Sequence, residues 1–276
     1  MTPAEKQARL ARLYDAEILP AYAARFAALL TRAIEARPGA RVVEIGCATG
    51  ALTLELARRF DRGSLLVALD ESPAFIAEAR TRFANEREPH AEVTFDAHAD
   101  LLSSIPVTDG AADLVVSNLA IAGAADPRAA VKEATRLLAP GGVLAVSAAL
   151  RGTWAEFLDL FREVLRENGR RDSLSAVDRY VAGLPDADEV GRWLEQAGLR
   201  RIEVSTARWE VLFKSAREFF FAPLVELGPL ADWKRLSGRG DQMQDIFFFT
   251  KEAIDTYFKD RVFSVTVAAG AVRGEK

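Results

Sequence analysis

Residues 42–57 read VVEIGCATGALTLELA and combine a short apolar run, an acid at Glu44, a glycine-containing loop and a helical pattern. A second apolar run, residues 65–69, ends at Asp70. A strand, a glycine turn and a helix, with an acid at the end of the next strand, are typical of nucleotide-binding folds, where that acid binds a ribose. The sequence therefore predicts a cofactor of the nucleotide type.

Apolar runs alternate with helical patterns through the first half of the chain. Further strands are expected around Val93 and Phe95, at residues 114–116 and at residues 143–150. Helices are expected at residues 50–60, from Ser72-Pro73, which suit an N-cap and first helical position, and from Asp126-Pro127 to residue 138. This alternation predicts an α/β fold with a doubly wound, mainly parallel sheet.

The two ends of the chain have different patterns. Residues 4–36 have helical spacing, and Pro20 is expected to divide them into two helices. Beyond residue 150, helices are expected at 154–166 and 186–197, and strands at 202–213 and 262–272. The phenylalanine-rich, turn-rich residues 215–260 lie between these strands as a cap inserted before the last one. We expect one domain over residues 1–276, with an N-terminal helical lid (1–39), a cofactor-binding core (40–150) and a C-terminal half (151–276) that carries the cap.

Composition excludes several classes of protein. The chain has 276 residues, half of them apolar, which suffices for a large core, and its net charge of −4 argues against a nucleic-acid partner. The charged N-terminus resembles no signal peptide and no apolar run would span a bilayer, so a cytoplasmic protein without membrane contact is expected. His90, His98 and Cys47 are too scattered for a metal site, and none is expected.

The loop itself separates two kinds of cofactor. A dinucleotide site has the pattern G-x-G-x-x-G, whereas this loop reads Gly46-Cys47-Ala48-Thr49-Gly50 and lacks the glycine three residues after position 48. The phosphate cradle is therefore incomplete. The carboxylate of Glu44 beside the loop suits a cationic cofactor better than an anionic one.

Five segments in order carry a resemblance to a known family. VVEIGCATG, LLVALDESP, AHADL, DLVVSNLA and LLAPGGVLAVS, spread over about residues 40–150, resemble the class I S-adenosylmethionine-dependent methyltransferases. The strands expected at 202–213 and 262–272 look like the terminal antiparallel pair of that family. The resemblance implies a seven-stranded, Rossmann-like methyltransferase fold, S-adenosyl-L-methionine as cofactor, and an enzyme that transfers its methyl group.

The resemblance also implies roles for individual residues. Glu44, Gly46, Ala48 and Gly50 match the E/D-x-G-x-G-x-G loop beside the methionyl part of the cofactor, with alanine at 48 where glycine is usual. Asp70, followed by Glu71, matches the ribose-binding acid, Asp100 and Leu101 match the pair beside the adenine, and Asn118 falls beside the transferable methyl group. Alternatives remain open: Glu44 as a capping or ion-pairing acid, Asp70 as a cap of the helix after Ser72, Asp96 in place of Asp100, and Asn118 as a turn residue.

The acceptor of the methyl group is less defined. Tyr14 and Tyr22, on the N-terminal helices, and Phe220, in the cap, are candidate substrate-binding residues together with Asn118. Simple helix packing for the tyrosines, or a core of the cap for the phenylalanines, explains them equally. The sequence indicates no catalytic base, because neither histidine falls near the methyl group.

A narrower resemblance concerns the acceptor itself. SNLA and PGGVLAVSAALRGTWAEF look like the malonyl-acyl-carrier-protein O-methyltransferases. It implies a small-molecule or acyl-carrier-bound acceptor, with a carboxylate as one candidate. Arg162, Arg166, Arg170 and Arg171 could then meet an acidic carrier protein, or simply form a solvated helix face. A binding or scaffold protein without turnover, and an N- or C-methyltransferase of another small molecule, remain alternatives.

Overall fold

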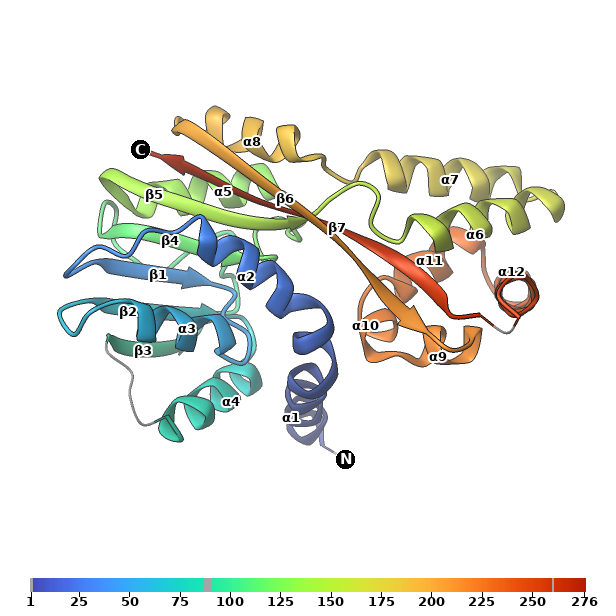
Figure 1. Cartoon of the computed structure of the whole chain (residues 1–276), viewed down its shortest axis with the longest axis horizontal. Coiled ribbons are helices and arrows are strands. Elements are labelled where there is room, and N and C mark those ends of the chain that lie inside the picture. The colour runs from blue at the N-terminus through green and yellow to red at the C-terminus, as the bar shows by residue number, and fades with distance from the viewer. Residues whose placement is uncertain (1, 87–90, 260) are drawn as a thin grey trace. The chain divides into compact units, whose positions relative to one another are not determined.

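The computed structural model of the chain, shown in Figure 1, describes residues 2–86, 91–259 and 261–276. The chain divides into two compact units. Unit 1 comprises the residues up to 148, residues 186–207 and residues 269–276, and unit 2 comprises residues 149–185 and 208–268. The described helices include none that is both long enough and apolar enough to cross a lipid bilayer.

Seven strands of the described chain form one sheet in the order β3-β2-β1-β4-β5-β7-β6. Their bounds are β1 Arg41–Ile45, β2 Leu65–Asp70, β3 Glu92–Ala97, β4 Ala112–Asn118, β5 Leu138–Ala149, β6 Arg200–Phe213 and β7 Phe263–Glu275. The first five pair in parallel, and Figure 1 shows β7 running opposite to β5 and β6. The expected doubly wound, mainly parallel sheet is confirmed, because strand order reverses at β1 and β4.

The helices of unit 1 flank this sheet. They are α1 Pro3–Leu13, the π-helix η1 Tyr14–Ala23, α2 Ala24–Arg32, α3 Ala51–Arg59, α4 Pro73–Ala84, α5 Pro127–Leu137 and α8 Ala187–Gln196. The predicted N-cap is present at Ser72, whose Oγ accepts from the N–H of Phe75 at 3.4 Å. At Asp126, where a helix was expected to begin, Oδ1 accepts from the N–H of Ala129 at 3.0 Å. The near-continuous burial of β1 and β4 fits a sheet covered on both faces.

The N-terminal helices differ from the expectation in one respect. Pro20 does not divide the segment but lies inside η1, between α1 and α2. The N–H of Ala24 donates to the carbonyl oxygen of Leu19, five residues back. The wider π-helical turn accommodates the missing N–H and the ring of proline without ending the helix.

Strand β5 also begins earlier than expected, at Leu138 instead of Val143. Leu138 pairs with Ala112, and the register shifts between Ala112 and Leu114. Gly142 lies at this irregularity, where an added Cβ would be 2.9 Å from the carbonyl oxygen of Ala139. The Pro-Gly-Gly sequence, whose pattern indicates the end of a helix, therefore lies within β5 at this irregularity.

Unit 2 is mainly helical. It contains α6 Ala155–Glu167, α7 Arg171–Ala182, α9 Ala216–Phe221, α10 Pro223–Glu226, α11 Leu230–Ser237 and α12 Asp241–Tyr257. Its core is aromatic, and the ring of Phe219 lies within 5.1 Å, centroid to centroid, of those of Phe157, Phe213 and Phe263. Helices α9 to α12 lie between β6 and β7 in the chain, which is the insertion expected before the last strand.

Candidate cofactor site

The loop between β1 and α3 contains three residues with left-handed backbone. φ is 76° at Gly46, 47° at Ala48 and 77° at Gly50. The glycines are also required by space, because an added Cβ would lie 2.3 Å from the Cβ of Ala120 at Gly46 and 2.9 Å from the Cβ of Ala79 at Gly50. Ala48 has a side chain in a conformation that costs an L-residue about 1–2 kcal/mol. This strain gives a physical reason for the glycine usually found there.

Asp70, the last residue of β2, holds this loop in place. Its Oδ2 accepts a hydrogen bond of 2.8 Å from the N–H of Ala48, and its Oδ1 accepts one of 2.9 Å from the N–H of Ser72. Burial raises the pKa of Asp70, while these backbone N–H groups act in the opposite direction. The carboxylate thus has a fixed orientation between the loop and the start of α4.

Glu44 lies beneath the loop and is only 1% exposed. Its Oε2 accepts a hydrogen bond of 2.6 Å from the hydroxyl of Thr53 on α3. Burial raises the pKa of Glu44 to about 7, with a smaller contribution from the negative charge of Asp70. Since burial penalises the charged carboxylate, a positive charge placed beside it would be stabilised strongly.

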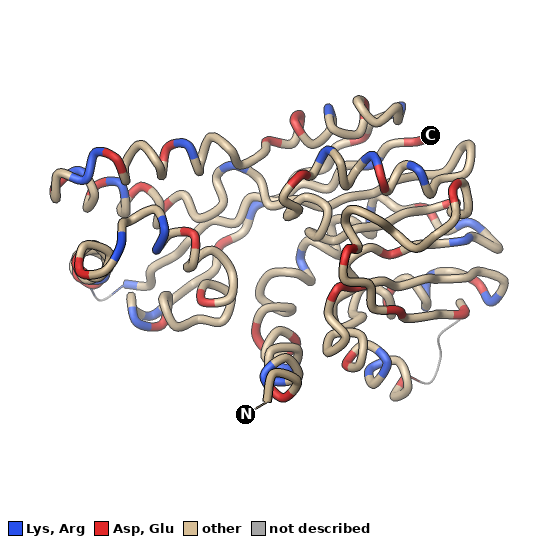
Figure 2. Tube along the Cα trace, turned by 180° about the vertical axis from the view of Figure 1, so that it is seen from behind, with Lys and Arg blue, Asp and Glu red and all other residues tan. Residues whose placement is uncertain are grey.

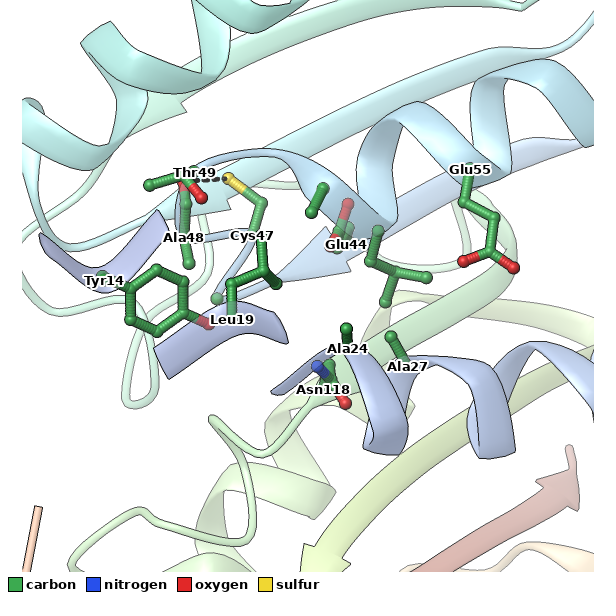
Figure 3. A pocket seen from close by; sticks show the side chains of 13 residues that line it. Tyr14, Leu19, Ala24, Ala27, Glu44, Cys47, Ala48, Thr49, Glu55 and Asn118 are labelled. Atoms are coloured by element: carbon green, nitrogen blue, oxygen red, sulfur yellow. Dashed lines mark hydrogen bonds between the residues drawn. The ribbon is translucent and has the colours of Figure 1, made fainter. Parts of the chain in front are cut away.

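A cleft opens between this loop and the N-terminal helices (Figure 3). The loop contributes Gly46 to Thr49 and the N-terminal helices contribute a wall that includes the ring of Tyr14. Glu44 and Asn118 lie at the carboxyl ends of β1 and β4, the edge where open α/β sheets bind ligands. The remaining lining residues are Leu19, Ala24, Ala27, Ala51, Leu52 and Glu55.

The electrostatics of this region centre on Tyr14. Burial raises the pKa of the Tyr14 hydroxyl, and so do the carboxylates of Asp70, Asp15 and Glu44, while Arg82 acts in the opposite direction. Asp15 is paired with Arg82, so Asp70 and Glu44 are the acids that add negative charge beside the cleft. Such an excess of negative charge in a half-buried place favours a ligand that carries positive charge.

Comparison with known proteins identifies the family. The Methyltransferase domain family matches residues 43–146. The demethylmenaquinone methyltransferase of Mycobacterium sp. (strain KMS) is 31% identical over 184 residues, which are 63% of this chain and 72% of that protein. The chain belongs to the class I S-adenosylmethionine-dependent methyltransferases. The cofactor of this family is S-adenosyl-L-methionine, as the sequence predicts.

Two further proteins, one curated relative and one solved structure, are similar to this chain. The malonyl-[acyl-carrier protein] O-methyltransferase of Hahella chejuensis is 33% identical over 159 residues, 58% of this chain and 50% of that protein. The present chain thus spans about half the length of that curated relative. Among solved structures, the YcgJ protein of Bacillus subtilis has a TM-score of 0.57 at 15% identity and covers 91% of this chain and 98% of its own. At that identity it supports the fold alone.

The side chain of Asn118, which lines the first cleft, forms hydrogen bonds with two neighbouring elements. Its Nδ2 donates to the carbonyl oxygen of Ala23 at 3.1 Å, and its Oδ1 accepts from the hydroxyl of Ser147 on β5 at 2.7 Å. The side chain therefore connects the end of η1 to the sheet. The role of Asn118 beside the methyl group stays a prediction.

Asp100, one of the two residues expected beside the adenine, lines a second cleft of the same unit. Glu71 and Asp100 line it together with residues 123–126, which follow β4. Leu101 is 1% exposed and anchors the turn that carries Asp100. Asp96, the competing acid, lies exposed on β3, and its Oδ1 accepts from the N–H of Ala97.

Two of the expected substrate residues lie elsewhere. Tyr22 packs its ring 4.8 Å from that of Phe26, and the lining of the first cleft does not include it. Phe220 belongs to the aromatic core of unit 2, with ring centroids 5.1 Å from Phe219 and 5.5 Å from Phe247. Both side chains pack against aromatic neighbours in their own units, and the substrate roles expected for them stay predictions.

His98 is not among the described residues that line the first cleft. It follows β3, and its N–H donates to the carbonyl oxygen of Asp70 at 2.9 Å. His90 lies outside the described residues. Across the described ranges, no three His, Cys, Asp or Glu residues are grouped so that they could hold a metal ion.

Sequence reasoning missed three polar residues of the site. Asp15 and Arg82 contact Thr49 of the glycine loop, and Arg82 comes from the last turns of α4. Thr53, which binds Glu44, is also absent from the expected set. An acid next to Tyr14 was the only signal in the sequence, because these contacts join segments far apart in the chain.

Proposed function

We propose that this chain transfers the methyl group of S-adenosyl-L-methionine to a small-molecule or carrier-bound acceptor. The observation that carries the proposal is the buried carboxyl group of Glu44 beneath a glycine loop, at a cleft beside which Asp70 adds negative charge. A sulfonium cofactor with an amino group supplies the positive charge that such a cleft favours. A dinucleotide, with its anionic pyrophosphate, does not.

The cofactor is proposed to extend from the first cleft toward the second. Glu44 and the loop residues Gly46, Ala48 and Gly50 would hold the methionyl part. Asp70, followed by Glu71, would accept hydrogen bonds from the ribose hydroxyls. The alternative role of Asp70 at the start of α4 does not compete, because each carboxylate oxygen has room for more than one donor.

Two further parts of the cofactor would meet other residues. The side chain of Asp100 and the backbone N–H of Leu101 are proposed to bind the adenine, since Asp100 lines the second cleft with Glu71. Asn118 and Tyr14 would lie nearest the methyl group, since both line the first cleft.

Methyl transfer from a sulfonium requires the protein mainly to position the two reactants. When bound, the sulfonium supplies both the methyl group and a neutral leaving group. The chain's own residues bind and orient the reactants, and the wall formed by Tyr14 and Leu19 excludes water from the loop. A carboxylate acceptor is ionised at neutral pH, so it needs no base, which is consistent with a cleft that His98 does not line.

For the acceptor we propose a carboxylate on a carrier-bound or small molecule. The similarity to a malonyl-[acyl-carrier protein] O-methyltransferase supports this choice, while the similarity to a demethylmenaquinone methyltransferase supports the alternative of another small molecule. A protein that binds the cofactor without turnover is the third candidate. Partners beyond the acceptor are not expected to include nucleic acid or membrane.

Two experiments test the proposal in sequence. Calorimetry with S-adenosylmethionine, S-adenosylhomocysteine and NAD should show binding of the first two and none of the third. Methyl-labelled cofactor is then offered with malonyl-carrier protein, free malonate and demethylmenaquinone. Label on the malonyl-carrier protein supports the carboxylate acceptor, and label on demethylmenaquinone alone would contradict it. Tight NAD binding without sulfonium binding would overturn the whole proposal.

A further inference from the structure

Asp15, the second residue of η1, joins three elements of unit 1. Its Oδ1 accepts a hydrogen bond of 2.5 Å from the hydroxyl of Thr49, and its Oδ2 accepts one of 2.5 Å from the guanidinium of Arg82. The Nε of Arg82 donates in turn to the carbonyl oxygen of Thr49 at 2.9 Å. The three residues thus form a closed ring of contacts between η1, the glycine loop and α4.

The ring reaches the cofactor site through its neighbours in the chain. Thr49 is 1% exposed and lies between Ala48 and Gly50, so any shift of its hydroxyl moves the loop. Tyr14 directly precedes Asp15 and its own ring packs 5.3 Å from that of Phe75 on α4. Fixing Asp15 therefore fixes both the loop and the aromatic wall opposite it.

The other end of η1 has its own attachment. Asn118 binds the carbonyl oxygen of Ala23, the last residue of η1. Between the two attachments the backbone is π-helical with Pro20 inside it. Pro20 supplies no N–H, so the side-chain attachments at Asp15 and Asn118 add to what the helical hydrogen bonds of this segment provide.

The charges of the ring are half-buried, with side-chain exposures of 34% for Asp15 and 27% for Arg82. A fully exposed ion pair of this kind contributes about 0–1 kcal/mol and rarely controls a structure. Here the pair is held by two additional hydrogen bonds to Thr49, and its geometry is bound to the loop. Its loss should therefore affect the cleft more than the overall stability of the chain.

We propose that Asp15 is a positioning residue that holds the Tyr14 wall closed over the cofactor, and that opening its contacts with Thr49 and Arg82 precedes release of the demethylated cofactor. This inference rests on the proposed placement of the cofactor in the first cleft. It adds a specific element, the Asp15–Thr49–Arg82 ring, which controls how long the cofactor stays bound and not whether the cleft recognises it.

The test measures the dissociation rate of S-adenosylhomocysteine from the full chain by rapid mixing with excess S-adenosylmethionine. In Asp15→Asn the amide oxygen can still accept a hydrogen bond from the hydroxyl of Thr49. The side chain no longer carries the negative charge that pairs with Arg82. Dissociation should accelerate about tenfold or more while association changes little, as expected when a half-buried charge pair is broken. The matched control is Glu17→Gln, an exposed acid of the same π-helix, which should change dissociation less than about twofold.

Further variants keep the outcome decisive. Arg82→Met should reproduce the effect of Asp15→Asn, and the double variant should be no faster than either single one, because all break the same ring. If Asp15→Asn does not fold, Arg82→Met alone decides. A folded variant that binds and releases S-adenosylhomocysteine at the parental rate overturns the inference. If the parent chain itself binds no S-adenosylhomocysteine, the proposed function fails instead.

Discussion

The backbone N–H of Ala48 donates a hydrogen bond of 2.8 Å to Oδ2 of Asp70, so the acid that ends β2 also supports the most strained residue of the glycine loop. The carboxylate stabilises the loop. We propose that it also binds the ribose of the cofactor. Substitutions at Ala48 and Asp70 separate the two roles.

Asp70→Ala should weaken binding of S-adenosylmethionine by about 2–4 kcal/mol, because two charge-assisted hydrogen bonds to the ribose would be lost. It should also lower the melting temperature, since the N–H groups of Ala48 and Ser72 lose their acceptor. Asp70→Asn should lose less of both. Calorimetry and thermal unfolding measure the two effects. Parental binding by Asp70→Ala, with weakened binding by Asp96→Ala, would contradict the assignment of Asp70 to the ribose.

Ala48→Gly should stabilise the empty protein by about 0.5–1 kcal/mol despite the added flexibility, because glycine relieves the left-handed conformation at this position. The hydrogen bond from its N–H to Asp70 is kept. Unfolding in urea, followed for the parent and the variant, gives the difference directly. A destabilised variant would show that the methyl group of Ala48 contributes packing that outweighs the strain.

Several parts of this arrangement were predictable from sequence because they depend on neighbours in the chain. The strand, loop and helix of residues 41–59 and the cap at Ser72 are local, and the structure has them where the patterns place them. The Asp15 ring was not predictable, since it unites residues separated by 34 and 67 positions. The π-helix was missed because proline normally indicates a break, and the wider helical turn that removes the clash has no sequence signature.

The C-terminal half shows the same contrast. Helix α7, Arg171–Ala182, was not expected, although Val177 is fully buried. Its sequence, RDSLSAVDRYVA, has charged residues in its first and last turns, and no element was predicted for it. Residues Arg170 and Arg171, considered as part of a carrier-binding surface, lie at its start. In the structure the helix packs against α6 and α11.

Binding of the cofactor should depend on pH through Glu44. Its pKa in the empty protein is about 7, above the ordinary 4.5, so the folded state favours the protonated acid. A cationic ligand favours the carboxylate, and binding below pH 7 must therefore release a proton. Affinity should rise by up to tenfold per pH unit from about pH 5 to 7 and then level off.

Calorimetry in buffers of different ionisation enthalpy measures this proton release, and Glu44→Gln should abolish it. The stability of the empty protein should change with pH in the opposite direction to the affinity for the cofactor. Because the folded-state pKa of this acid is raised, the empty protein should lose stability relative to Glu44→Gln as the pH rises from about 4.5 to about 7. An affinity that is flat over this range in the parent would mean that Glu44 is already ionised in the empty cleft.

The phenylalanines of α9 should separate folding from acceptor choice. Phe219 is fully buried in the aromatic core of unit 2, whereas Phe221 is 71% exposed, with Arg217 at 6.0 Å from its ring centre. Phe219→Ala should destabilise the chain by about 3–5 kcal/mol through the cavity it leaves. Phe221→Ala should unfold like the parent, within about 0.5 kcal/mol.

The sequence predicts that residues 215–260 form a cap, and here we take it to cover the acceptor. Phe221→Ala should then raise the acceptor KM severalfold while the Kd of S-adenosylmethionine stays within about threefold. The reason is that an exposed apolar side chain contributes mainly where a ligand buries it. Arg217→Ala, which removes the cation beside the same ring, is the matched comparison. It should leave the KM unchanged for an apolar acceptor and raise it for an anionic one. Steady-state kinetics with the acceptor found by methyl labelling decide between these results. An unchanged KM in both variants would remove this face of α9 from acceptor binding, whereas weakened cofactor binding in a folded Phe221→Ala would assign it to the cofactor instead.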